Sequence, residues 1–146
     1  MSIQTKFENI LNANEQYIVH QCNCVTKKSK GLSKQIFDKY PQSNIYHKRQ
    51  GPDEPGTIIV KERIINILGQ FYPGRSKGIY DTKEKRLIWF QEALDKIALI
   101  NDIHSIAIPY RIGCGLAGGN WKEYLDKLKN FAENHPGINV TMYRLK

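Results

Sequence analysis

Two segments of the chain repeat the same order of elements: a short apolar strand, a loop that contains glycine, and a helix. The first starts with Tyr17–Cys22 and reaches a helix that begins at Gly31. The second starts with Ser105–Ile108 and reaches a helix for which Asn120 is the expected N-cap. Short, largely apolar strands are typical of sheets that helices cover on both faces. The alternation of strands with helices therefore predicts an α/β fold with three layers, α/β/α.

The remaining strands fit this architecture. Strands are expected at Ile3–Phe7 and Ile138–Leu145, and a β-rich hairpin at Thr57–Val60 and Arg63–Leu68. The hairpin and the short first strand predict a mixed central sheet rather than an all-parallel one.

Three helices complete the pattern. The first ends at Pro41, because proline breaks a helix. The second follows Asp81 and Glu84, which have the spacing of a capping box. The expected apolar faces of the three helices are Leu32, Ile36 and Phe37; Leu87, Phe90, Leu94 and Ile97; and Trp121, Leu125, Leu128 and Phe131.

The chain has 146 residues, 40% of them hydrophobic, which is enough for one packed domain. No repeat or linker divides it, so residues 1–146 are expected to form a single domain and a monomer. No segment holds the roughly 20 apolar residues that cross a membrane. Residues Met1–Lys6 lack the apolar core of a signal peptide, and the cysteine count is odd. We therefore expect reduced thiols and a cytoplasmic location.

Positive charge is concentrated in the first third of the chain. Lys and Arg number 22 against 14 Asp and Glu, which gives a net charge of +8, and residues 1–50 hold eight basic and three acidic side chains. Such a surplus favours an anionic partner, either a phosphorylated small molecule or nucleic acid. A lysine-rich surface that only keeps the protein in solution would account for the same charge.

The glycine-rich loop at Gly113–Gly119 predicts a phosphate site. Loops that follow neighbouring parallel strands meet at the carboxyl edge of the sheet, where open α/β sheets bind ligands. Glycines let backbone amides approach an anion, and a helix N-terminus directs further N–H groups toward it. A tight turn before the helix is the alternative, but it needs one or two glycines, whereas this loop has four in seven residues.

The residues of the two loops resemble the macro domain family, whose members bind ADP-ribose. The first segment reads His20-Gln21-Cys22-Asn23-Cys24, then Lys30-Gly31-Leu32-Ser33 and Lys39-Tyr40-Pro41, and the second reads Arg111-Ile112-Gly113-Cys114-Gly115-Leu116 with Trp121. The His-x-Cys-Asn-Cys segment is similar to that of the ADP-ribose 1″-phosphate phosphatases. The Ile-Gly-Cys-Gly-Leu segment is similar to that of the terminal ADP-ribose protein glycohydrolases, among them antitoxins that strip ADP-ribose from DNA. The resemblance covers nearly the whole chain in order.

The resemblance implies a set of ligand-binding residues. Asn9, next to Ile10, takes the position of an aspartate that accepts a hydrogen bond from the adenine amino group. Tyr143 and Leu145 flank the adenine, unless Tyr143 serves only strand packing. Asn23 reaches the distal ribose. The phosphate side is lined by Lys30, Gly31 and Leu32 in the first loop and by Ile112, Gly113, Cys114, Gly115, Leu116 and Ala117 in the second.

Two residues depart from the glycohydrolase pattern. That branch uses a lysine after the fourth strand and an aspartate in the second glycine loop, and these positions hold Gln70 and Ala117 here. Glutamine forms no Schiff base and alanine is no base, so lysine-dependent release of ADP-ribose is disfavoured. Gln70 remains a ligand-binding candidate.

His20 is the remaining candidate for catalysis. An ordinary imidazole pKa near 6.5 suits proton transfer at neutral pH, and the phosphatase branch carries a histidine at this position. His20 would serve a phosphate ester at the 1″ carbon as acid, base or nucleophile, with Asp81 only a distant candidate for an acidic partner. The alternative is a strand histidine that is hydrogen-bonded within the sheet. Lys28 and Lys30 are expected either to neutralise a terminal phosphate or to be solvated.

His20, Cys22 and Cys24 alternate along one strand, with Cys114 in the neighbouring loop, as a zinc site would require. Structural zinc sites take their cysteines from turns, however, and a strand holds alternate side chains roughly 6–7 Å apart. We therefore expect buried neutral thiols, no metal and no cofactor.

Together these features predict a macro domain hydrolase that converts ADP-ribose 1″-phosphate to ADP-ribose. Three alternatives stay open: a hydrolase that removes ADP-ribose from protein or nucleic acid by substrate-assisted water attack, a reader that binds ADP-ribose without turning it over, and a nucleic-acid-binding module. The expected partners are ADP-ribose or a derivative of it, and ADP-ribosylated protein or nucleic acid. A membrane is not among them.

Overall fold

A six-stranded mixed sheet forms the middle layer of the molecule, as the sequence predicts. The computed structural model describes residues 3–145. Its strands and helices are β1 (Gln4–Phe7), β2 (Tyr17–Cys22), α1 (Gly31–Lys39), β3 (Ile58–Lys61), β4 (Ile64–Leu68), α2 (Lys83–Ile97), β5 (Ser105–Pro109), α3 (Trp121–Asn134) and β6 (Asn139–Arg144). Two short 3₁₀ helices that the sequence did not predict, Ile10–Asn12 and Pro41–Ser43, follow β1 and α1.

The strands lie in the order β1-β6-β5-β2-β4-β3. Only the hairpin pairing of β3 with β4 is antiparallel within the described residues; all other neighbours are parallel. The expectation that the short first strand also makes the sheet mixed is wrong, because β1 runs parallel to β6 with Phe7 opposite Arg144. The parallel strands β2, β4 and β5 therefore all end at one edge of the sheet.

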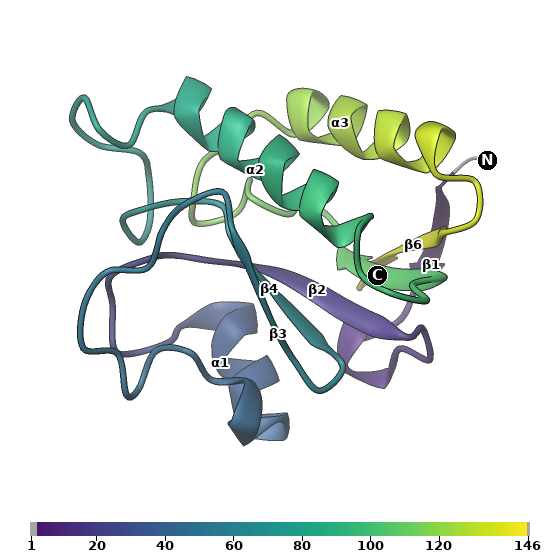
Figure 1. The fold of residues 1–146 in the computed structure, drawn as a ribbon, viewed down its shortest axis with the longest axis horizontal. Helices are drawn as coiled ribbons and strands as arrows, with labels where there is room; N and C mark the ends of the chain where they lie inside the picture. Colours follow the sequence, from purple (N-terminus) through teal and green to yellow (C-terminus); the bar gives the residue numbers. More distant parts are fainter. Residues whose placement is uncertain (1–2, 146) are drawn as a thin grey trace.

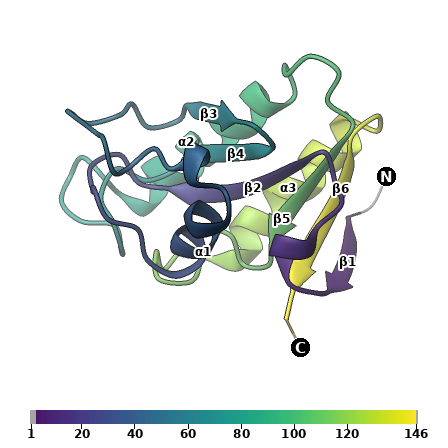
Figure 2. The same cartoon turned by 90° about the horizontal axis from the view of Figure 1, so that it is seen from below.

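Helices cover both faces of the sheet. Helices α2 and α3 lie side by side on one face, and α1 lies on the opposite face (Figures 1 and 2). Alternation along β2 sends Val19 toward the α2 and α3 layer, while Ile18, His20 and Cys22 face α1. Nearly all side chains of β2, β4 and β5 are buried, which explains why the sequences of these strands are largely apolar.

Two details of the helices differ from the sequence prediction. Thr82, not Asp81, is the N-cap of α2, and its side chain accepts a hydrogen bond from the amide of Lys85. The capping-box prediction was wrong because Asp81 pairs with Arg86 and is fully buried. On α3 the apolar face includes Tyr124, which the prediction omitted, whereas Trp121 is only partly buried. Over residues 3–145, no helix combines the length and apolar character that a membrane crossing requires.

Candidate functional site

A cavity of about 920 Å³ opens at the edge of the sheet where β2, β4 and β5 end. Its wall consists of the loop from β2 to α1, the first turn of α1, part of the loop after β4, and the loop from β5 to α3. These loops gather at the left of Figure 1. The cavity therefore lies where open α/β sheets bind their ligands.

Most of the residues that the sequence predicts for the site line this cavity. They are His20, Asn23, Lys30, Gly31, Leu32, Gln70, Ile112, Gly113, Cys114, Gly115, Leu116 and Ala117. Asn9, Ile10, Tyr143 and Leu145 are not part of its wall.

The residues expected around adenine lie together at the end of β1 and β6. Because Phe7 is paired with Arg144, the segments that carry Asn9 and Leu145 leave the sheet at the same edge. The Asn9 side chain accepts a hydrogen bond from the amide of Leu11 at 2.9 Å and caps the 3₁₀ helix that starts at Ile10. Leu145 is exposed.

Tyr143 connects this region to the cavity wall. Its hydroxyl donates to Oε1 of Glu15 at 2.6 Å, and its backbone carbonyl accepts from the amide of Tyr110, which lines the cavity. Burial and the neighbouring Glu15 carboxylate raise the pKa of Tyr143 to about 12, so the phenol is neutral at physiological pH.

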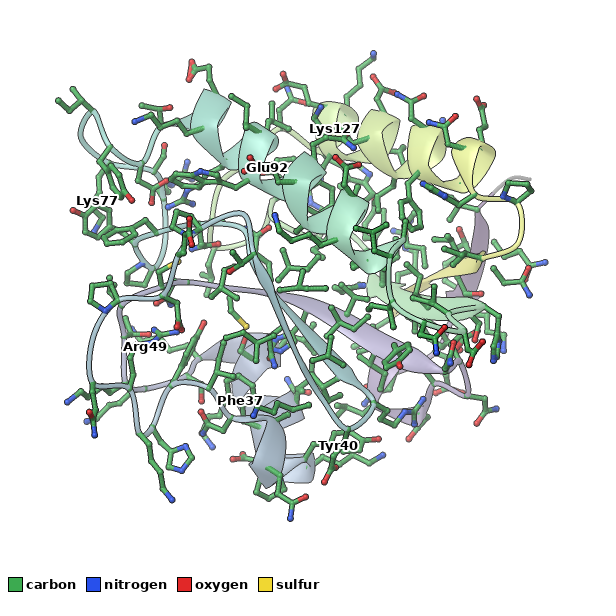
Figure 3. The ribbon with its side chains drawn as sticks, in the orientation of Figure 1. Phe37, Tyr40, Arg49, Lys77, Glu92 and Lys127 are labelled. Atoms are coloured by element: carbon green, nitrogen blue, oxygen red, sulfur yellow. The ribbon has the colours of Figure 1, made fainter. Side chains whose placement is uncertain are left out.

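Asn23 shapes the first loop from within. Its side-chain oxygen accepts hydrogen bonds from the amides of Val25 and Thr26 and from the Thr26 hydroxyl. Arg49 donates to the carbonyls of Asn23 and Thr26 and pairs with Asp53 at 2.8 Å. Arg49 lies among the loops at the left of Figure 3. The loop is therefore held in one shape before any ligand arrives.

The first turn of α1 presents unsatisfied donors to the cavity. The first amides of a helix have no partner within the helix, and Lys30 at the N-cap position supplies no side-chain hydrogen bond to them. Gly31 has a φ of +57°, which favours glycine at this entry point. Amides that point into a cavity at a helix N-terminus form an anion site.

The second loop needs glycine at position 113 for two reasons. Gly113 has a φ of +77°, and a Cβ there would lie 2.6 Å from the ring of Tyr124. The loop therefore packs directly on the buried side chain of Tyr124. Beside it, Ile112 and Cys114 are buried, whereas Leu116 is exposed at the rim.

A buried ion pair joins the two sides of the rim. The Arg86 guanidinium donates to both carboxylate oxygens of Asp81, at 2.6 and 2.7 Å. It also donates to the carbonyls of Tyr72 and Gly74 in the loop after β4, and to that of Ala117 in the second glycine loop. One side chain thus fixes both loops. Asp81 is committed to this pair and does not line the cavity.

The wall of the cavity is cationic. Of its residues that the structure describes, four carry positive charge (Lys27, Lys28, Lys30 and Arg111) and none is Asp or Glu. Three of these cations come from the basic first third of the chain, and low-dielectric walls strengthen the effect of all four on an anion.

Gln70 is held by hydrogen bonds on both ends of its amide. Its Oε1 accepts from Gln21 at 2.7 Å, and its Nε2 donates to the carbonyls of Tyr72 and Gly74. Gln70 therefore stabilises the loop that follows it.

His20 lies in the core between β2 and α1 and is 1% exposed. Its Nδ1 is 3.0 Å from the Ser33 hydroxyl and its Nε2 is 2.6 Å from Oδ1 of Asn66, the residue opposite it on β4. Phe37, labelled on α1 in Figure 3, packs edge-on against the ring. Burial lowers the pKa of His20 to about 4, so the ring is neutral at neutral pH.

The three thiols are buried, as predicted, and free. Burial raises the pKa of Cys22 and Cys24 to about 12 and that of Cys114 to about 11, so all three are protonated at neutral pH. Over residues 3–145, no group of three His, Cys, Asp or Glu side chains is arranged to hold a metal ion.

Sequence reasoning missed several residues of the site. Ser33, Tyr46 and Arg111 line the cavity. Asn66 is hydrogen-bonded to His20 on the side of the ring that faces the core. A signal for Asn66 was present, because a single amide inside the apolar strand Ile64–Leu68 has to be hydrogen-bonded when buried. Ser33 and Arg111 belong to the motif segments of the two loops, but their residue types did not set them apart as cavity residues.

Solved structures resemble this chain over its whole length. The macrodomain of Mycobacterium tuberculosis DarG is 23% identical, covers 99% of this chain and 98% of its own, and has a TM-score of 0.74. The macrodomain of Thermus aquaticus DarG is 22% identical, with 97% of each chain covered and a TM-score of 0.76. A mutant of an Oceanobacillus iheyensis macrodomain is 12% identical over 97% of this chain and 83% of that one, at a TM-score of 0.67. No protein-family model and no curated protein sequence matches the chain.

Proposed function

The chain has the macrodomain fold, and from this premise we propose that it binds ADP-ribose in the cavity between its two glycine loops. The observation that carries the proposal is the convergence of the α1 N-terminus, the second glycine loop and four cationic side chains on one cavity of about 920 Å³. Backbone amides and cations together suit a diphosphate. The volume lies within the range of cavities that enclose ligands of this size.

Titration calorimetry with ADP-ribose tests the proposal, and one glycine substitution blocks the site. A Cβ at Gly115 meets no atom within 4 Å, so the backbone there has room for a side chain, and Gly115→Glu places a carboxylate where the phosphates are expected. We expect this variant to bind ADP-ribose at least about tenfold more weakly.

Gly137→Glu is the matched control. Gly137 also has free space around its Cβ position, but it lies between α3 and β6, outside the cavity wall. Its affinity should equal that of the unsubstituted protein. The proposal fails if ADP-ribose gives no heat while DNA binds in a salt-dependent manner, since that result would favour a nucleic-acid-binding module.

We propose ADP-ribose 1″-phosphate as a second candidate ligand, with hydrolysis to ADP-ribose as the reaction. The four cations exceed the charge of a diphosphate, which supports a further phosphate group. Both ring nitrogens of His20 are occupied within the protein, so a role in hydrolysis requires the Ser33 hydroxyl to turn away from Nδ1.

Phosphate release from ADP-ribose 1″-phosphate, compared between the unsubstituted protein and His20→Ala, tests this reaction. Because the pKa of His20 is about 4, a neutral His20 nucleophile or base adds no pH dependence of its own to the rate from about pH 5 to 8. A general acid instead gives a rate that rises as the pH falls toward 4. If both proteins are inactive, the proposed hydrolysis of ADP-ribose 1″-phosphate is wrong. If both are equally active, His20 has no part in the reaction.

A further inference from the structure

Three side chains form a hydrogen-bonded row from the core to the cavity: Asn66 on β4, His20 on β2 and Ser33 on α1. Of the three, Ser33 and His20 border the cavity. The direction of each hydrogen bond in this row follows from the groups at its buried end.

Asn66 has one possible amide orientation. Its Nδ2 lies 3.3 Å from the carbonyl of Ser43 and 3.0 Å from that of Ile59, and both carbonyls can only accept. The Asn66 Oδ1 therefore faces His20 and accepts a hydrogen bond from Nε2. This contact places the single proton of the neutral ring on Nε2 and leaves Nδ1 as an acceptor.

Ser33 must then donate its only proton to His20. The alternative acceptor, the Gln21 carbonyl, is 3.5 Å away, against 3.0 Å for Nδ1. The Cys22 thiol, a further polar group beside the ring, is neutral and lies 3.6 Å from Nε2. With its proton committed, the Ser33 oxygen offers only lone pairs to a ligand.

We propose that Ser33 is a specificity-determining residue whose oxygen accepts a hydrogen bond from a hydroxyl of the second ribose of the ligand, the ribose that ADP lacks. The inference rests on the proposed function and deepens it. The α1 amides next to Ser33 only donate and therefore suit phosphate, whereas the Ser33 oxygen only accepts and repels a phosphate oxygen. The α1 amides would therefore bind a phosphate, and the Ser33 oxygen beside them would bind a hydroxyl of a ribose that is joined to that phosphate. His20 and Asn66 are positioning residues, since they fix the polarity of the Ser33 hydroxyl.

The test compares ADP-ribose with ADP, which lacks the second ribose, by calorimetry. We expect Ser33→Ala to lose about threefold to tenfold in affinity for ADP-ribose and to bind ADP unchanged. Ser33→Thr, which keeps the hydroxyl, should retain the preference for ADP-ribose. Ser29→Ala is the matched control, because Ser29 precedes α1 but does not line the cavity.

Two results separate this inference from the proposed function. If the unsubstituted protein does not bind ADP-ribose, the proposed function is wrong. If it binds but Ser33→Ala weakens both ligands equally or neither, only the role of Ser33 is wrong. Nitrogen-15 NMR of the free protein provides a ligand-independent check: the His20 signals should show a protonated Nε2 and an unprotonated Nδ1, and the opposite tautomer would overturn the inference.

Discussion

The Arg86→Ala variant should unfold with a free energy about 3–5 kcal/mol lower than that of the unsubstituted protein. The loss is large because Asp81, which is fully buried, keeps its carboxylate but loses both hydrogen bonds from the guanidinium. Carbonyls in two loops each lose one hydrogen bond in the same substitution. Urea denaturation monitored by circular dichroism measures the effect.

ADP-ribose affinity should fall in the same variant at temperatures where it remains folded, because the loops that border the cavity lose their common anchor. Lys83→Ala on the exposed face of the same helix is the control, and we expect it to change stability by less than about 0.5 kcal/mol. In the double variant Asp81→Ala/Arg86→Ala, the loss should be smaller than the sum of the single losses. A stability change below about 1 kcal/mol for Arg86→Ala would contradict the role of this pair.

Acid should destabilise the protein through His20. Burial lowers the folded-state pKa to about 4, whereas an ordinary histidine titrates near 6.5, so the unfolded chain binds the proton more readily. The stabilisation is complete above pH 6.5 and is lost as the pH falls through 4. The difference in pKa corresponds to about 3 kcal/mol.

The measurement is the unfolding free energy between pH 7.5 and 4, compared with that of His20→Gln. This variant is less stable at neutral pH, but its stability should fall less steeply below pH 6.5. His47→Gln, at an exposed histidine, should show the same dependence of unfolding free energy on pH as the unsubstituted protein. Equal slopes for His20→Gln and the unsubstituted protein would show that His20 is not buried as the neutral form.

The order of strands and helices followed from sequence because each element carries its own local signal. Tyr17–Cys22 begins and ends as predicted, and Pro41 and Asn120 mark helix boundaries where expected. The two glycine loops were also found, since the chain has to place glycine where φ is positive, as at Gly31 and Gly113.

The partners of polar groups were decided by tertiary structure alone. Asp81 has the sequence spacing of a helix cap, yet it pairs with Arg86. The buried guanidinium needs a carboxylate partner, whereas Thr82 can cap the helix in place of Asp81. His20 offered equal evidence for catalysis and for a structural role, and its surroundings depend on Asn66 and Ser33, which are distant in sequence.

By itself, then, the sequence determined where strands, helices and glycine turns occur, since these depend on propensity and periodicity over a few neighbouring residues. The three-dimensional packing decided which charges meet, which groups hydrogen-bond His20 and which way the Ser33 hydroxyl points. Hydrogen bonds and pKa values depend on atoms within a few ångströms, and the fold brings those atoms together from separate parts of the chain.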